Sequence, residues 1–322
     1  MNLQEVIGID ANQTRFAFLP QTAGRRFSSF EEGTNMFKSI LVPGLNAACN
    51  ETALELGVKV ARLFDGHIDC LHVHPDSREL ARHVPVMDAR AGTFTGQIWD
   101  SRIASDKMCA SKSRKTFDAF CAGEHIGEKG AVTASWCEAE GNDLEQTIVE
   151  AYYHDLVVFA RPNPPEDLTT MGVGDVLVEC GRPLLLAPST KCPNPLSTIV
   201  IAWKDMAASA HAVTAAIPLL KKAETIHVLC VAESDGDDQS SRASVERMAN
   251  YLRRHGLKVQ AGQIHANGRN VCDVLLREAD TTLHAGLLVM GGYGHSRARE
   301  FIFGGFTRQV LLSAPIPVFL SH

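Results

Sequence analysis

Short apolar runs alternate with amphipathic segments along most of the chain, and this alternation predicts strands separated by helices. A β-branched run at 39–43 is followed by apolar residues at helical spacing over 51–64. The same order returns as a run at 198–202 and a helical pattern over 207–222. Near-continuous apolar strands between helices are typical of parallel sheets that are covered on both faces.

The whole series of elements occurs twice, with a period of about 160 residues, which is the length of a domain rather than of a solenoid repeat. The predicted strands are 39–43, 67–73, 131–136, 155–159 and 183–187 in the first series, and 198–202, 225–231, 257–261, 286–290 and 317–320 in the second. We therefore expect two tandem α/β domains built from right-handed βαβ units. They are predicted at 36–190 and 191–322, joined near the proline-rich segment 188–195.

Two segments lie outside this repeat. Residues 1–35 are polar with little periodicity, and we interpret them as an N-terminal tail or arm. The first domain carries an insertion at about 77–126. The spacing of its apolar residues predicts one long helix after a loop that contains Pro85 and Gly92.

Charge and composition narrow the classes of function. The 322 residues carry 31 Lys and Arg against 37 Asp and Glu, a net charge of −6, so no basic excess exists to bind nucleic acid or a membrane surface. No apolar run reaches the roughly 18 residues that span a bilayer, and the first residues lack the apolar core of a signal peptide. The nine cysteines are scattered without a C-x-x-C pair, which is typical of reduced thiols in a cytoplasmic protein.

The most specific motif follows the predicted strand 286–290. Gly291, Gly294 and Gly304 are spaced G-x2-G-x9-G between this strand and a second helical pattern. Glycines let the backbone approach a ligand closely, and the free N–H groups at the start of a helix bind anions. A strand, a glycine loop and a helix in this order predict a phosphate site, whereas glycines alone would only turn the chain.

With this motif, the repeated α/β pattern resembles the universal stress protein family in its tandem two-domain bacterial form. The resemblance covers about residues 36–322, and it is specific in the second half and weak by motif in the first. It implies in each half a five-stranded parallel sheet of order 3-2-1-4-5 with helices on both faces, of the nucleotide-binding α/β hydrolase-like type. It also implies that ATP or a related adenine nucleotide, with or without Mg²⁺, binds at the carboxyl ends of strands 1 and 4.

Carried over residue by residue, the resemblance places the nucleotide in the second half. The motif glycines and Gly305 would offer backbone N–H groups to the phosphates, while Ala202, Trp203 and Val231 would line the base and ribose. The full set of candidate nucleotide-binding residues is Ala202, Trp203, Lys204, Asp205, Val231, Met290, Gly291, Gly294, His295, Gly304, Gly305, Phe306 and Thr307.

Two of these positions depart from the family pattern. Gly305 stands where Ser or Thr is expected, and Lys204 stands where Asp is expected. Thr307 and Asp205 lie close enough in the sequence to supply the missing hydroxyl and carboxylate. Lys204 would either meet a phosphate or block the base.

The first half departs further from the pattern. The strand 155–159 runs into Ala160, Arg161 and Pro162 where glycines are expected, and Leu45 takes the place of the strand-1 Asp. Proline lacks the N–H that a phosphate needs. We therefore expect no nucleotide in the first half, and we interpret Gly172 and Gly174 as loop glycines.

Catalytic and metal chemistry is weakly indicated. The chain contains no G-x4-G-K-[ST], G-x-S-x-G or H-E-x-x-H motif, so no catalytic residue is assigned. His72 and His74 lie two residues apart at a predicted strand end, a spacing that brings two ligands to one face. Since no cysteine or carboxylate pattern lies near them in the sequence, no metal site is assigned.

Three hypotheses for function remain. The leading one is a stress-response or signalling protein that binds adenine nucleotide in its second half only. The alternatives are a ligand-free tandem interaction module with both sites closed, and a weak ATP-hydrolysing enzyme. In each case the two halves are expected to pair through their last strands as a pseudo-dimer within the chain, and two chains are expected to form a homodimer.

Overall fold

The computed structural model divides the chain into two compact units, residues 1–34 and residues 35–322. It describes residues 37–44, 51–75, 91–127, 132–161, 170–189, 194–232, 239–292 and 305–322, all of which belong to the second unit. The N-terminal segment interpreted as a tail or arm lies outside the described residues. So do residues 190–193 of the proline-rich segment between the two halves and residues 293–304 of the glycine loop.

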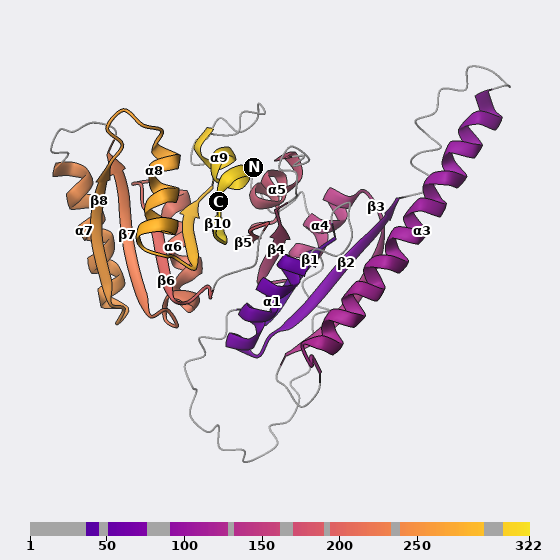
Figure 1. Ribbon diagram of the computed structural model, residues 1–322, viewed down its shortest axis with the longest axis horizontal. Coiled ribbons are helices and arrows are strands. Elements are labelled where there is room, and N and C mark those ends of the chain that lie inside the picture. Colours follow the sequence, from indigo (N-terminus) through magenta and orange to yellow (C-terminus); the bar gives the residue numbers. More distant parts are fainter. Residues whose placement is uncertain are drawn as a thin grey trace, which may run out of the picture. The chain divides into compact units, whose positions relative to one another are not determined.

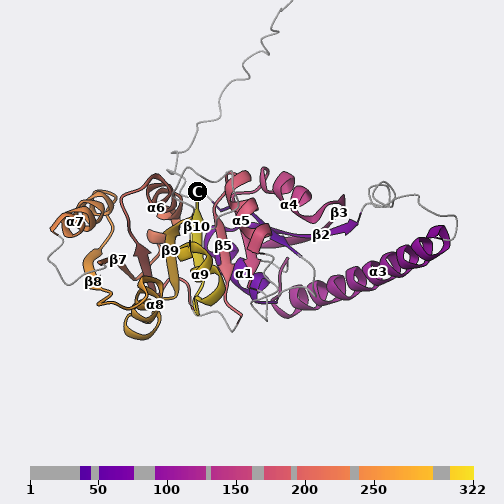
Figure 2. The ribbon, with the colours of Figure 1, turned by 90° about the horizontal axis from the view of Figure 1, so that it is seen from above.

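The first half alternates strands and helices in the predicted order (Figure 1). Its elements are β1 (Ser39–Pro43), α1 (Glu51–Phe64), β2 (His67–Pro75), α3 (Ala91–Gly123), β3 (Thr133–Gly141), α4 (Asp143–Ala151), β4 (Leu156–Ala160), α5 (Thr170–Glu179) and β5 (Leu184–Ala187). The long α3 is the helix expected in the insertion, and it lies along β2 and β3 (Figures 1 and 2).

Three glycines lie in helices where the sequence suggested loops. Gly92 falls in the first turn of α3, and Gly172 and Gly174 fall inside α5. Glycine costs a helix only about 1 kcal/mol relative to alanine. In α5 that cost is offset by the apolar residues Val176 and Leu177, which are fully buried in the core.

The second half repeats the series. Its elements are β6 (Thr198–Ala202), α6 (Ala207–Leu220), β7 (Thr225–Ala232), α7 (Gln239–Arg254), β8 (Val259–His265), α8 (Val271–Arg277) with a π-helical turn over Glu278–Thr282, β9 (Leu287–Gly291), α9 (Gly305–Ser313) and β10 (Val318–Ser321). The repeat extends to the helix caps. Asn142 before α4 and Asn270 before α8 each accept hydrogen bonds from the N–H groups two and three residues on.

The strands of the described residues form one sheet of ten, in the order β3-β2-β1-β4-β5-β10-β9-β6-β7-β8. Each half therefore has the predicted order 3-2-1-4-5, with parallel neighbours. The two halves meet where β5 and β10 pair antiparallel, Leu185 opposite Phe319 and Leu186 opposite Val318. This is the expected pairing through the last strands.

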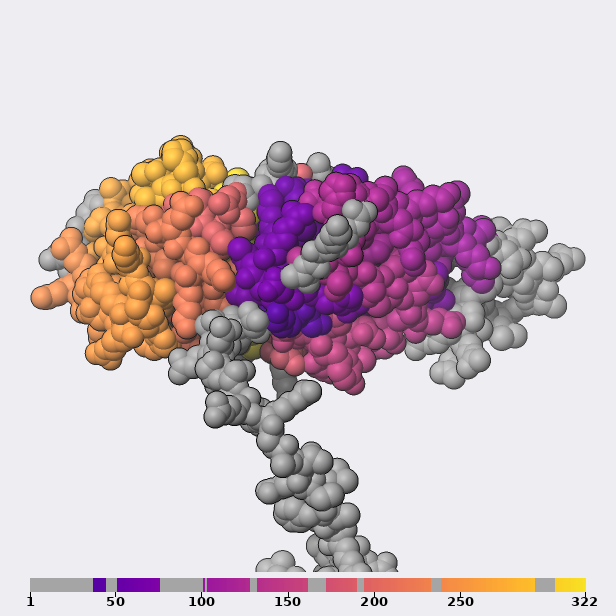
Figure 3. All heavy atoms as spheres, turned by 90° about the horizontal axis from the view of Figure 1, so that it is seen from below, coloured from indigo at the N-terminus to yellow at the C-terminus, as the bar shows by residue number. Residues whose placement is uncertain are grey.

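Helices cover both faces of the sheet (Figure 2). One core layer lies under α1, α3, α6 and α7, and the other under α4, α5, α8 and α9. The first layer is continuous across the junction, because Phe37 packs edge-on against both Phe64 of α1 and Phe319 of β10. Figure 3, which views the molecule from below, shows the indigo surface of the first half against the salmon-coloured surface of the second half. No helix of the described residues is both long and apolar enough to cross a membrane.

Arg161 makes a second connection between the halves. It follows β4 and is 6% exposed. Its Nε donates to the carbonyl of Leu311 at 2.7 Å, and its terminal nitrogens donate to the carbonyls of Val310 and Ala314. These carbonyls lie in and just after the last turn of α9, where the helix dipole favours a positive charge. Burial lowers the pKa of Arg161 to about 10, so the guanidinium stays charged at neutral pH.

We predict that Arg161→Leu lowers the free energy of unfolding by about 3 kcal/mol, because buried carbonyls at the end of α9 lose a charged donor. Arg182→Leu is the matched control. Arg182 donates to one carbonyl, that of Tyr152, in an exposed setting, so its loss should cost less than about 1 kcal/mol. Urea unfolding followed by circular dichroism measures both. An equal loss of unfolding free energy in the two variants would show that Arg161 has no special role at the junction.

Candidate functional site

The strand order of the second half reverses at β6, which lies between β7 and β9. In open α/β sheets the carboxyl ends of the strands at such a reversal form the crevice where ligands bind. Ala202 at the end of β6 lies beside Met290 near the end of β9. The structure therefore brings together the two segments that the family resemblance assigns to the nucleotide.

Two helices begin at this edge of the sheet. Met206 precedes α6 in an extended conformation and makes no side-chain capping bond. Gly305 begins α9 and is exposed, and a Cβ atom built on it would meet no described atom within 4 Å. The first N–H groups of each helix have no partner within the helix and lie at its positive end. The edge thus offers backbone donors and open space beside Gly305.

Gly291 and Gly292 have a packing requirement that needs no ligand. A Cβ on Gly291 would lie 2.5 Å from backbone atoms of Ala208 and Ser209, so only glycine lets α6 approach the end of β9. A Cβ on Gly292 would lie 2.5 Å from Leu177 of α5, across the junction between the halves. The N–H of Gly292 also donates to the carbonyl of Ser321 at 2.9 Å. The start of the glycine loop is therefore held by the protein itself.

The segment after β6 points toward α7. Trp203 packs against the core layer under α1, α3, α6 and α7. Its Nε1 donates to Ser244 Oγ at 2.8 Å. Ser244 in turn donates to Asp205 Oδ1 at 2.6 Å, and Arg247 lies 3.4 Å from the other carboxylate oxygen. Asp205 is thus engaged with α7 from an exposed position. Lys204, which lies between Trp203 and Asp205 in the sequence, is exposed.

The remaining candidate residues divide between the core and the loop. Met290 is 3% exposed and Thr307 is 6% exposed, while Val231 and Phe306 are half-buried against the α8–α9 core layer. The side chain of Met290 is therefore not available to a ligand. Gly294, His295 and Gly304 lie outside the described residues.

The first half carries Arg161 at the position equivalent to Gly292. The N–H of Arg161 donates to the carbonyl of Ala187 at 3.0 Å, as that of Gly292 does to Ser321. The strand ends are thus alike, but the side chain of Arg161 crosses to α9. Leu45 and the prolines that follow Arg161 lie outside the described residues.

A polar cluster around Asp69 was not indicated by any sequence motif. Asp69 on β2 accepts from Ser135 Oγ, from Cys137 Sγ at 3.3 Å and from His154 Nε2 at 3.0 Å, and His67 Nε2 lies 3.2 Å away. Burial of Asp69 raises its pKa, but the hydrogen bonds from Ser135, His154 and Cys137 outweigh it and hold the pKa below the ordinary 3.8. The parallel register of β2 and β3 places Asp69 opposite Ser135. A prediction of this strand pairing from the sequence would have brought the two residues together.

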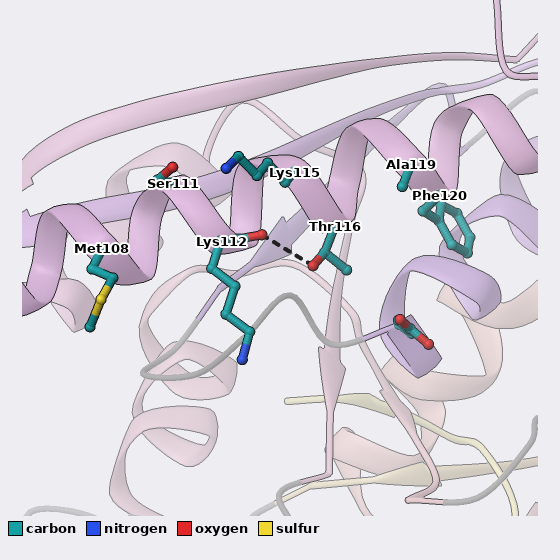
Figure 4. A pocket seen from close by; sticks show the side chains of 8 residues that line it. Met108, Ser111, Lys112, Lys115, Thr116, Ala119 and Phe120 are labelled. Carbon is teal, nitrogen blue, oxygen red and sulfur yellow. Dashed lines mark hydrogen bonds between the residues drawn. The ribbon is translucent and has the colours of Figure 1, made fainter.

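An open hollow of about 760 Å³ lies beside α3 (Figure 4). It is lined by Glu51, Met108, Ser111, Lys112, Lys115, Thr116, Ala119 and Phe120. Thr116 Oγ1 donates to the carbonyl of Lys112 at 3.1 Å, so this hydroxyl is held within the helix. None of the described candidate nucleotide-binding residues lines this hollow, and it belongs to the first half.

Comparison with known proteins identifies the second half. Residues 196–322 match the model of the universal stress protein family. The C-terminal half of this chain is a universal stress protein domain. No curated protein shows a significant match to the chain.

Solved structures share the fold of both halves. A universal stress protein from Archaeoglobus fulgidus has a TM-score of 0.64 at 14% identity, over 90% of this chain and 98% of that one. A putative universal stress protein from Pseudomonas aeruginosa has a TM-score of 0.56 at 16% identity, over 89% of this chain and 94% of that one. A functionally unknown protein from the same species has a TM-score of 0.56 at 17% identity, over 89% of this chain and 93% of that one. At these identities the likeness shows the fold alone.

In the universal stress protein domain, we predict that Gly291→Ala lowers the free energy of unfolding by about 1–3 kcal/mol, because the new methyl group would overlap the backbone of α6. Gly305→Ala is the control, since its Cβ enters open space and should change stability by less than about 1 kcal/mol. Both are measured by urea unfolding without nucleotide. No loss in Gly291→Ala would mean that packing does not require this glycine.

We also predict that Asp69→Ala costs about 2–3 kcal/mol at pH 7, because the buried His154 and the half-buried Ser135 and Cys137 lose their acceptor. The ionised carboxylate stabilises the fold above its ordinary pKa of 3.8, and this contribution is lost as the pH falls through the lowered folded-state pKa. The difference between wild type and variant in urea unfolding should therefore shrink below about pH 4. The exposed Asp118→Ala on α3 is the control, and a difference that stays constant with pH would contradict the role of the charge.

Proposed function

We propose that this chain is a universal stress protein with one adenine-nucleotide site, in its C-terminal domain, and a first domain that is structural. The observation that carries the proposal is the asymmetry after the fourth strand of each half. Gly292 begins a glycine loop in the second half. Its equivalent Arg161 is buried in the first half, with its guanidinium committed to α9.

The open edge of the second half supports the binding of phosphate. Gly305 at the start of α9 is exposed and has free space where a Cβ would stand. The first N–H groups of α9 have no partner within the helix, and together with its positive end they favour an anion there. Lys204, exposed after β6 at the same edge, adds a positive charge that forms no ion pair with the described residues. ATP is the nucleotide that the family resemblance implies.

The first domain supports binding poorly. The three prolines that follow Arg161 in the sequence, Pro162, Pro164 and Pro165, remove N–H donors. Because the guanidinium of Arg161 already faces three carbonyls, its charge is not free for a phosphate. The scattered cysteines form no disulfide among the described residues, which is consistent with a protein of the cytoplasm. Pairing of two chains as a homodimer remains an expectation from the resemblance.

A ligand-free interaction module is the second candidate function. Gly291 and Gly292 are both required by packing, so these two glycines do not by themselves indicate a phosphate. Asp205 is also engaged by Ser244 and Arg247 rather than turned toward a ribose. Mass spectrometry of the denatured, freshly purified protein separates the candidates, since nucleotide retained through purification excludes the ligand-free module.

Titration calorimetry of the full chain with ATP and magnesium is expected to give one nucleotide per chain. Gly305→Glu should weaken binding by about tenfold, because a carboxylate near the phosphates costs roughly 1–2 kcal/mol. It should not lower stability, since an acidic residue suits the first turn of a helix. Gly305→Ala, which also fills the open space, should bind within about threefold of wild type.

Three outcomes would overturn the proposal. Absence of heat together with an unchanged melting temperature in ATP would show that the chain has no ATP site. Two nucleotides per chain would contradict a structural first domain. Equal affinity in Gly305→Glu and Gly305→Ala would place the phosphates away from the start of α9.

A further inference from the structure

A second cluster of chemical interest lies in the first half, where β2, β3 and α3 meet. His72 and His74 lie two residues apart on β2, so their side chains are on the same face of the sheet. The long α3 lies along this face, with Phe117 against Trp136 of β3. Asp106 of α3, which follows His74 by 32 residues, is thereby brought beside both histidines.

The three side chains converge on one point. Asp106 Oδ1 lies 3.4 Å from His72 Nε2, and Asp106 Oδ2 lies 2.6 Å from His74 Nδ1. One donor atom from each of the three residues lies within 4.8 Å of the other two. A zinc ion needs imidazole nitrogens and carboxylate oxygens at about 2.0–2.2 Å, which spaces its ligands a little over 3 Å apart. Small side-chain rotations would bring these atoms to such spacing.

His72 has an unmet polar atom within this cluster. The residue is 7% exposed, and its Nε2 makes no hydrogen bond with the described residues. Its ring is fixed by stacking on Trp136, with centroids 5.9 Å apart and planes 16° apart, and by an edge-on contact with His74. Buried polar atoms are seldom left without a partner. A metal ion bound to Nε2 would supply one.

Glu138 completes the arrangement from β3. Its Oε2 lies 3.6 Å from His74 Nε2, and its Oε1 accepts from Trp136 Nε1 at 2.7 Å. The hydrogen bond from Trp136 holds the carboxylate of Glu138 beside Nε2 of His74. Nδ1 of His74 donates to Asp106 Oδ2 at 2.6 Å. A metal ion on Nδ1 would replace this proton, and Nε2 would then carry the ring proton toward Glu138. Histidines that bind metals are held by an outer carboxylate in this way.

The position of Asp106 in α3 also needs explaining. The side of α3 that faces the sheet carries Ile103, Asp106, Ala110, Ser113 and Phe117, at alternating three- and four-residue spacing. A carboxylate in the inward row of a helix is costly unless it is paired. The pair with His74 satisfies one of its oxygens, and the other faces the unpartnered nitrogen of His72.

We propose that His72, His74 and Asp106 bind a divalent transition-metal ion, and that zinc fits them best. Two imidazoles and one carboxylate suit zinc, and a fourth position remains for water. The ion would join α3 to the edge of the sheet, because two ligands come from β2 and one from α3. Glu138 acts as a positioning residue through His74.

The test begins with protein stripped by a chelator and titrated with zinc chloride in a calorimeter. One zinc per chain is expected, with a rise in melting temperature. Asp106→Asn, which keeps the shape of the side chain, should weaken binding at least about tenfold, and Glu138→Gln should weaken it less. Asp118→Asn, an exposed acid on the same helix, is the matched control and should bind as wild type does.

Absence of zinc binding would overturn the proposal, as would binding unaffected by Asp106→Asn. Cobalt(II) gives an independent readout in wild-type protein, in case a variant folds poorly. We expect visible ligand-field bands of a four- or five-coordinate site without a thiolate charge-transfer band in the near ultraviolet. A thiolate band would assign the metal to one of the cysteines instead and would also overturn the proposal.

Discussion

The antiparallel pairing of β5 and β10 is the interaction on which the rest of this molecule depends. It joins two parallel sheets of order 3-2-1-4-5 into one sheet of ten strands and relates the halves by an approximate twofold axis. Each half thereby presents the end of its fourth strand to the other half. Arg161 at the end of β4 reaches α9, and Gly292 at the end of β9 meets Leu177 of α5. The segments that would hold phosphate are therefore part of the junction.

The two equivalent strand ends consequently face different constraints. In the first half, a charged side chain fills the junction and stabilises the negative end of α9. In the second half, a residue with no side chain admits the neighbouring helix and leaves the positive end of α9 open. One helix thus connects the two roles, since Arg161 holds its last turn while Gly305 begins its first. Arg161 of the first half and Gly305 of the second are therefore linked through α9.

Much of the fold could be predicted from the sequence, because apolar periodicity over short runs reports directly on strands and helices. The strands at 39–43 and 198–202 and the helix at 51–64 agree with the structure at both ends. The family motif located the β6–β9 edge. The role of Gly291 could not be read in this way, because glycine spacing does not distinguish a phosphate from the backbone of a neighbouring helix. The structure shows that Ala208 and Ser209 occupy that space.

Contacts between residues far apart in the sequence could not be predicted either. His72 and His74 are visible as a pair in the sequence, but Asp106 lies beyond a loop and within an inserted helix, so no local spacing connects the three. The cluster around Asp69 was missed for a related reason, since its partners come from β3 and from the end of α4 and become neighbours only once the register of β2 and β3 is known. Residues brought together by tertiary packing leave little trace in periodicity.

The composition of the strands at the junction has a consequence for the independence of the halves. β5 reads Leu-Leu-Leu-Ala and β10 reads Val-Phe-Leu-Ser, without a charge or a proline, whereas the true outer strands β3 and β8 carry Glu138, Glu140 and Gln260. Outer strands of natural sheets are protected by charged or polar residues, and unprotected apolar ones pair with whatever strand they meet. If the chain were cut between its halves, each piece would expose an apolar edge strand with unpaired backbone N–H and C=O groups. The pieces are then expected to reassemble or aggregate.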